Sequence, residues 1–122
     1  MVKLIFCLRR REDVSEEEFH RYWLEEHGPL VAGYAELFGI RRYVQVHAAH
    51  NEVAGAIAAT RGAPEPFDGV AELWFDSTDA LIAATSSDAG QEAGQRLLED
   101  ERRFIDHARS PLFLAEEHAI IA

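Results

Sequence analysis

Cysteine is almost absent from this 122-residue sequence, because Cys7 is the only one. A single cysteine excludes an intrachain disulfide and any metal cluster built on several thiolates. Cys7 lies within an apolar run, where a thiol usually behaves as a small hydrophobic side chain. We therefore expect a buried Cys7, with a reactive nucleophile as the alternative.

Long hydrophobic runs are lacking as well. No apolar stretch reaches the roughly 20 residues that a membrane-spanning helix needs. The short run at residues 2–8 precedes the arginines at 9–11, which is the reverse of the order in a secretion signal. We expect a cytoplasmic protein that forms one domain over residues 1–122.

Positive charge is scarce, since 12 lysines and arginines stand against 22 aspartates and glutamates, for a formal net charge of −10. Nucleic acids and anionic membranes are bound largely by cationic side chains. The charge balance therefore argues against both kinds of partner. The excess of acidic residues is explained by solubility and does not identify a substrate.

Motifs of cofactor chemistry are also missing. The sequence contains no glycine-rich phosphate loop, no dinucleotide-binding fingerprint and no nucleophile elbow around a serine. His47 and His50 lie three residues apart and could form a metal site with His27, but this spacing fixes no third ligand. We expect neither a cofactor nor a metal.

The sequence does contain a regular alternation of strand and helix patterns. Ser15 and Glu18 have the spacing of a capping box, which predicts a helix start. Phe19, Trp23 and His27 then recur at four-residue intervals on one side of that helix. The pair Gly-Pro at 28–29 should end or bend this helix, and a second segment should cover 30–38 until a glycine stops it.

The remaining elements follow from the same patterns. We expect strands at 2–8, 40–48, 70–76 and 112–118, and a short helix at about 51–60. A helical region should cover 77–108, with a break near 86–87 and a restart at Asp88, which has capping-box spacing to Gln91. On one side of that region Leu97 and Leu98 precede Phe104 and Ile105 by two turns.

The order β-α-β-β-α-β is that of an α+β, ferredoxin-like domain with an antiparallel four-stranded sheet. Two main helices can cover only one face of such a sheet, yet both faces of the expected strands are largely apolar. An exposed apolar face of this size is unfavourable in a monomer. We therefore expect a homodimeric α/β barrel, in which two sheets pack together and enclose a cavity between them.

Two stretches of the sequence resemble the EthD family, which is named after a protein of an ethyl tert-butyl ether degradation locus. They are residues 19–30, which contain Trp-x-x-x-His-Gly-Pro-Leu, and residues 68–77. Arg42-Tyr43 and residues 104–106 match as well. The resemblance implies a dimeric α/β barrel with a pocket between a helix end and the sheet. Some members are auxiliary proteins of degradation operons, and related barrels include lactone isomerases and polyketide cyclases, dehydratases and decarboxylases that transfer protons beside a carbonyl without a cofactor.

His27 and Tyr43 are the first candidates for catalysis. His27 continues an apolar helix stripe, so it should point inward, where a histidine can donate or accept a proton. The alternative is a histidine that bonds the last helix carbonyls. Tyr43 can donate a hydrogen bond to a developing enolate oxygen, although it could equally be a half-buried structural tyrosine. The resemblance to methylmuconolactone isomerases implies pocket roles for a histidine and a tyrosine at these two positions.

Glu72 is the third catalytic candidate, because it lies in an apolar strand where a carboxylate must be paired or neutral. It could act as a general base or orient His27, and an ion pair with Arg41 or Arg42 is the structural alternative. Trp74 shares its strand face and could line a pocket for a flat or aromatic ligand.

Trp23 and His47 complete the expected substrate-binding set, with Trp74. Tryptophan also occurs in small cores without any ligand. His47 should share one strand face with Tyr43 and Gln45, while Arg42, Val44 and Val46 lie on the other face.

Two functions remain open at this level. The first is a cofactor-independent lyase or isomerase that moves a proton on a cyclic or polyketide-like carbonyl compound in a catabolic or biosynthetic pathway. The second is a non-catalytic auxiliary or small-molecule-binding protein that supports an oxygenase system. A monooxygenase on the same barrel is a third and weaker possibility. In each case the expected partners are a second copy of the chain and a hydrophobic or aromatic small molecule.

Overall fold

The computed structural model describes residues 1–122, and its elements follow the expected order. The strands are β1 (Val2–Leu8), β2 (Arg42–His47), β3 (Gly69–Phe75) and β4 (Leu112–Ala115). The helices are α1 (Glu16–Tyr22), the π-helix η1 (Trp23–His27), α2 (Gly28–Gly33), α3 (Ala35–Phe38), α4 (Glu52–Thr60), α5 (Thr78–Ser86), α6 (Asp88–Glu101) and the 3₁₀ helix η2 (His107–Arg109). Strands β2 and β4 are shorter than predicted.

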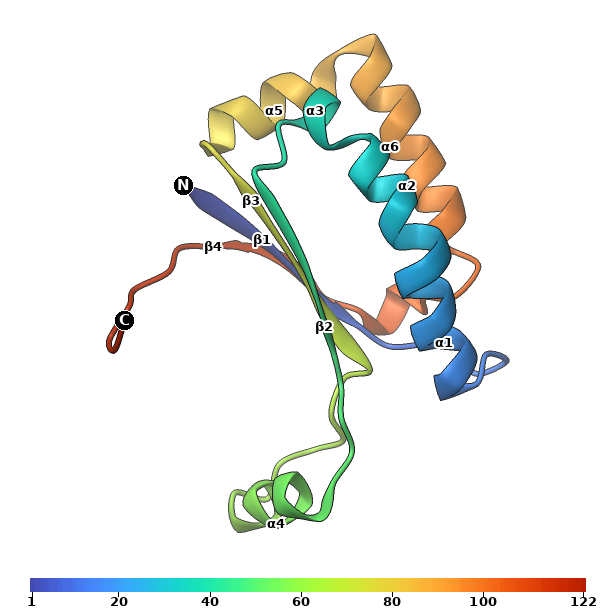
Figure 1. Ribbon diagram of the computed structural model, residues 1–122, viewed down its shortest axis with the longest axis vertical. Coiled ribbons are helices and arrows are strands. Elements are labelled where there is room, and N and C mark those ends of the chain that lie inside the picture. The colour runs from blue at the N-terminus through green and yellow to red at the C-terminus, as the bar shows by residue number, and fades with distance from the viewer.

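The four strands form one sheet in the order β2-β3-β1-β4, and every neighbouring pair is antiparallel. This is the ferredoxin-like arrangement, so the predicted fold class is confirmed. The apolar strand β1 lies in the interior of the sheet, as expected. Helices α1 to α3, α5 and α6 lie on one side of the sheet, and no helix covers the other side (Figure 1).

The strand register decides which side chains meet. Leu73 lies opposite both Leu4 and Tyr43, so these three belong to one face of the sheet. The neighbouring Glu72 lies opposite Val44, and both belong to the other face. Tyr43 and Glu72 therefore point to opposite sides. We call the helix-covered side the core face and the other side the open face.

Two clusters of buried side chains lie on the core face. The larger cluster consists of Leu8, Phe19, Trp23, Ala71, Phe104 and Ile105. The smaller one consists of Phe38, Phe75 and Ala93. Burying a large apolar side chain stabilises a fold by about 1.5–3 kcal/mol, so these clusters hold the helices on the sheet.

Trp23 needs a glycine in the strand beneath it. A Cβ atom at position 69 would overlap the indole ring of Trp23, so only Gly69 lets the ring lie directly against β3. Gly39 has a different role, because its φ of 70° ends α3 in the left-handed conformation that glycine adopts without strain. This confirms the predicted stop after residue 38.

The first helix starts as predicted but does not end at Gly28. The Ser15 hydroxyl accepts the N–H of Glu18, which confirms the cap. Gly28 keeps helical dihedrals, and its N–H donates to the carbonyl of Trp23 five residues earlier. Pro29 has no N–H and follows directly after this wide turn, in the first turn of α2. At that position a helix needs no hydrogen-bond donor from the backbone. The helix therefore continues through a π-turn, a feature often found at functional sites.

The second helical region breaks near residues 86–87, as predicted, but the cap differs. The Ser87 hydroxyl accepts the N–H of Gly90, so Ser87 and not Asp88 caps α6. The helix also ends at Glu101 rather than at residue 108. Phe104 and Ile105 are buried as expected, although they reach the core from the turn after the helix.

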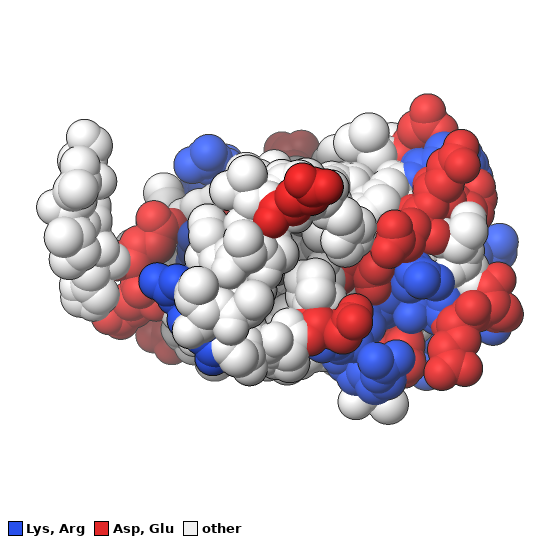
Figure 2. Space-filling view, turned by 90° about the horizontal axis from the view of Figure 1, so that it is seen from below, with Lys and Arg blue, Asp and Glu red and all other residues white.

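Helix α4 is exposed along its whole length. It lies where a short helix was predicted and is capped by Asn51, and none of its residues is buried, with Val53 70% and Ile57 54% exposed. Figure 1 shows it beyond the ends of β2 and β3. Figure 2 views this end of the molecule, where mostly uncharged atoms cover the front and most of the acidic and basic side chains lie toward the right. No helix of the chain combines the length and the hydrophobicity needed to cross a bilayer.

Candidate functional site

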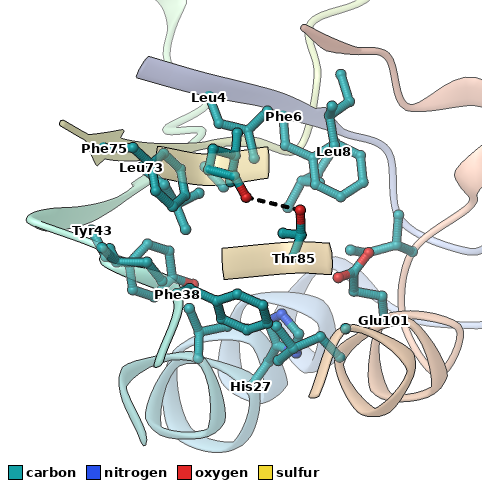
Figure 3. Close-up of a pocket in the computed structure, with 18 of the residues that line it drawn as sticks. Leu4, Phe6, Leu8, His27, Phe38, Tyr43, Leu73, Phe75, Thr85 and Glu101 are labelled. Carbon is teal, nitrogen blue, oxygen red and sulfur yellow. Dashed lines mark hydrogen bonds between the residues drawn. The ribbon is translucent and has the colours of Figure 1, made fainter. Parts of the chain in front are cut away.

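An apolar cavity of about 260 Å³ lies between the core face of the sheet and the helices. Of the 19 residues that line it, 15 are hydrophobic, so it fits a small and largely apolar molecule. Figure 3 shows Leu4, Phe6 and Leu73 of the sheet on one side of this cavity and His27 and Phe38 of the helices on the other.

We expected a cavity between the sheets of two chains, on the open face, and that cavity stays a prediction. The apolar cavity seen in the structure lies within one chain, because its walls are the core face of the sheet and the helices that cover that face. This agrees with the pocket between helix end and sheet that the family resemblance implied.

His27 lies in the wall of the cavity and is only 5% exposed. Its Nδ1 atom is 2.7 Å from Oδ2 of Asp100, and its ring packs against Phe104 with 5.1 Å between ring centroids. It therefore bonds a carboxylate and not the helix carbonyls that the alternative required. The other ring nitrogen, Nε2, has no hydrogen-bond partner within the chain. Every fully buried polar side-chain atom of the chain has a partner, so Nε2 must be at least partly accessible.

Asp100 was not among the predicted site residues. It lies on the last turn of α6 and accepts two short hydrogen bonds, from His27 at Oδ2 and from the Tyr22 hydroxyl at Oδ1, the latter 2.6 Å long. Burial and the Asp100 carboxylate raise the pKa of Tyr22 to about 12, so this phenol stays protonated and donates. Tyr22 and Asp100 together fix the orientation of the His27 ring.

Tyr43 lines the same cavity from β2. Its oxygen accepts a hydrogen bond of 2.9 Å from Nε2 of Gln45. Burial raises the pKa of Tyr43, and hydrogen bonds from Gln45 and Trp23 oppose that rise only in part. The phenol is therefore protonated at neutral pH and can donate to an oxygen in the cavity.

Two further polar side chains line the cavity, Thr85 and Glu101. The Thr85 hydroxyl donates to the Leu81 carbonyl of its own helix. The Glu101 carboxylate is 3.0 Å from Nε2 of His107. Asp100 and Glu101 are adjacent at the end of α6, and each of them pairs with a different histidine, His27 and His107 respectively.

Glu72 and Trp74 lie on the open face, away from His27 and Tyr43. The Glu72 carboxylate is 2.6 Å from Nζ of Lys3, so its ion pair is with a lysine and not with Arg41 or Arg42. Trp74 also stacks with Lys3, whose Nζ is 4.6 Å from the ring centroid. The structure thus brings His27 and Tyr43 together and separates Glu72 and Trp74 from them.

Trp23 and His47 are neighbours, with 4.4 Å between their ring centroids. Trp23 reaches the cavity, whereas His47 lines a shallower depression between the edge strand β2 and the helices η1 and α2. Nδ1 of His47 is 2.7 Å from Nδ1 of His20, and His50 pairs with Glu16 at 3.2 Å. No three histidine, cysteine or acidic side chains are grouped so that they could hold a metal ion.

The sequence profile of the EthD domain matches residues 11–108. No curated protein matches the chain. Among solved structures, an EthD family protein of Bacillus halodurans is 22% identical, with 97% of this chain and 99% of that chain covered and a TM-score of 0.65.

Two other similar structures carry informative descriptions. A dimeric protein of unknown function with a ferredoxin-like fold from Bacteroides fragilis is 16% identical, with 95% of each chain covered and a TM-score of 0.59. A variant of SnoaB, a cofactor-independent oxygenase of Streptomyces nogalater, is 14% identical, with 96% of this chain and 92% of that chain covered and a TM-score of 0.56. At these identities the similarity shows a common fold.

Proposed function

The chain belongs to the EthD domain family, and on this basis we propose that it is a cofactor-independent isomerase or lyase. Its substrate would be a cyclic or polyketide-like compound with a carbonyl group, and its reaction would move a proton on the adjacent carbon. One observation carries this proposal: a carboxylate-held histidine lies in the wall of an apolar cavity. A tyrosine with a free hydroxyl proton lines the same cavity.

His27 would act as the general base. The hydrogen bond from Nδ1–H to Asp100 leaves the lone pair on Nε2, the atom without a partner in the chain. Nε2 can then take a proton from a carbon next to a carbonyl and return it at another carbon. A positioned base of this kind contributes about 10²–10⁴-fold to a rate.

Tyr43 would stabilise the enolate that forms when the proton leaves. Its pKa is raised by burial, so it keeps its proton and can donate a hydrogen bond to the enolate oxygen. The walls around both groups are mostly apolar, and a hydrogen bond to a developing negative charge is stronger in such surroundings than in water. Neither step uses a cofactor.

The alternative is a non-catalytic protein that binds a hydrophobic small molecule in the same cavity, in support of an oxygenase system. The predominantly hydrophobic lining supports this equally well. The Asp100–His27 pair supports the enzyme over the carrier, because a carrier has no need of an oriented base. SnoaB, which has a similar fold, is a cofactor-independent oxygenase, and this supports a third candidate, a monooxygenase on the same barrel.

A homodimer is part of the proposal. The open face carries the following side chains: Lys3, Ile5, Cys7, Arg42, Val44, Val46, Val70, Glu72, Trp74, Phe113 and Ala115. Val46 is 45% and Phe113 50% exposed in the single chain. A second copy packed on this face would bury them, in line with the dimer described for the Bacteroides fragilis structure. Light scattering should then give about twice the 13.7 kDa of one chain.

The function can be tested with β-tetralone, a bicyclic ketone with acidic hydrogens beside its carbonyl. In heavy water, NMR measures the rate at which these hydrogens are replaced by deuterium. The wild type should accelerate the exchange, and His27→Gln should lose the acceleration while Glu99→Gln, an exposed change on α6, keeps it. Binding of β-tetralone without any acceleration would instead support the carrier function.

A further inference from the structure

Four polar side chains form an unbroken hydrogen-bonded line along the core face of β2, which we call the polar chain. It runs from His20 on α1 through His47 and Gln45 to Tyr43. Its links measure 2.7 Å between the two Nδ1 atoms, 2.8 Å from His47 Nε2 to Gln45 Oε1, and 2.9 Å from Gln45 Nε2 to the Tyr43 oxygen. The proposed roles of His27 and Asp100 do not use it.

The direction of every hydrogen bond in the polar chain can be deduced. Gln45 Nε2 lies 2.8 Å from the carbonyl oxygen of Trp23, which can only accept, so this end of the amide is the NH₂ group. The other end is the oxygen, and His47 Nε2 must therefore carry a hydrogen. A neutral His47 then has a bare Nδ1, so His20 donates to it. All donors point toward Tyr43.

The surroundings keep His47 neutral. Burial and the neighbouring His20 lower the pKa of His47, and the indole of Trp23 packs on its ring. Glu16, one turn before His20 on α1, is paired with His50, and neither ring of the polar chain contacts a carboxylate. The arrangement with Nε2–H on His47 is thus the stable one at neutral pH.

We propose that Gln45, held by His47 and His20, is a positioning residue that turns the Tyr43 hydroxyl proton toward the cavity. This inference rests on the proposed proton-transfer function. A phenol oxygen that already accepts from Gln45 has its proton free for another partner, and no group of the chain accepts it. The site would therefore favour ligands whose carbonyl or enolate oxygen accepts a hydrogen bond from Tyr43 over ligands that can only donate hydrogen bonds.

The test uses Gln45→Leu, which removes both ends of the amide, and Gln45→Glu, which replaces the donor by an acceptor. Gln95→Leu on the exposed side of α6 is the matched control, since Gln95 makes only a 3.3 Å bond to Glu99. NMR of the imidazole nitrogens reports the tautomer of His47, and carbon NMR of labelled tyrosine, assigned with Tyr43→Phe, reports the titration of Tyr43.

We expect the Nε2–H form of His47 in the wild type. Gln45→Leu should raise the pKa of Tyr43, because it removes a donor that favours the phenolate, and Gln45→Glu should raise it further by adding a negative charge. Both variants should slow the β-tetralone exchange at least about tenfold with little change in the Kd of β-tetralone. The control should change none of these quantities.

The outcomes separate this inference from the proposed function. If the wild type carries the hydrogen of His47 on Nδ1, the deduced direction of the polar chain is wrong. This measurement needs no variant, so the inference can be tested even if Gln45→Leu fails to fold. If exchange requires His27 but neither Gln45 variant changes it, the positioning role fails and the proposed function stands. If the wild type shows no exchange, the proposed function fails, and the tautomer and the Tyr43 titration still decide whether Gln45 orients the phenol.

Discussion

The Asp100→Asn substitution changes one carboxylate oxygen next to His27 into an amide nitrogen and keeps the size of the side chain. In the wild type, Oδ2 of Asp100 accepts from His27 Nδ1 at 2.7 Å, which holds the hydrogen on Nδ1 and the lone pair on Nε2. An asparagine amide can instead donate to Nδ1. The hydrogen of the neutral ring then moves to Nε2, and the base that faces the cavity is lost.

The size of the effect follows from these contacts. The exchange of β-tetralone hydrogens should fall by about 10²–10⁴-fold, which is the usual contribution of a general base. Stability should fall as well, because Asp100 accepts charge-assisted hydrogen bonds from His27 and Tyr22 in a largely buried position. Weakening these bonds should lower the free energy of unfolding by about 1–3 kcal/mol.

The assay compares deuterium exchange and urea unfolding for Asp100→Asn, the wild type and Glu99→Gln. The control removes one negative charge from the same helix end at an exposed position, so it corrects for the general effect of charge. An exchange rate in Asp100→Asn equal to that of the wild type, with His27→Gln inactive, would refute the orienting role of Asp100.

Three further predictions follow from the same contacts. Tyr22→Phe should lower the free energy of unfolding by about 1 kcal/mol at neutral pH, because it removes the hydrogen bond to Asp100. The wild type should also lose stability as the pH rises from 10 to about 12, because Tyr22 ionises in this range in the unfolded chain and stays protonated in the folded one. Urea titrations that show neither effect would contradict the hydrogen bond to Asp100. Because the pKa of His47 is lowered in the folded chain, the unfolded chain binds a proton below pH 6.5 that the folded chain does not, so the free energy of unfolding should fall on acidification. His47→Gln should weaken this pH dependence in thermal melts. An unchanged pH dependence in His47→Gln would show that His47 is already charged in the folded chain. Burial raises the pKa of Cys7, so iodoacetamide should label it more slowly than a free thiol at neutral pH, and equal rates with and without urea would disprove its protection.

Much of the fold could be predicted from local patterns. The serine at position 15, the asparagine at 51 and the glycine at 39 mark helix boundaries that depend only on their own neighbours. Alternation within β2 and β3 also assigned each side chain to its strand face. These features are local, so the sequence contains the information directly.

The relation between strands could not be predicted in the same way. Tyr43 and Glu72 each have a definite face within their own strand, but only the register of β2 against β3 shows that these faces are opposite. A shift of one residue would have joined them, since the side-chain period of a strand is two. The separation of Glu72 from His27 follows from this register.

Asp100 was missed because 73 positions separate it from His27 and its neighbours are acidic. A signal did exist, since Ala93, Leu97 and Phe104 form the apolar stripe of this region, and Asp100 lies on it. A carboxylate on an apolar stripe requires a buried partner. The identity of that partner depends on how α6 packs against η1, which no local pattern specifies.

The most direct measurement is the nitrogen NMR spectrum of His27 in mildly alkaline buffer, recorded before and after β-tetralone is added. The structure predicts a hydrogen on Nδ1, an unprotonated Nε2, and a change in the Nε2 resonance when the ketone occupies the cavity. A hydrogen on Nε2, or an Nε2 resonance that does not respond to the bound ketone, would contradict the assignment of His27 as the base of this site.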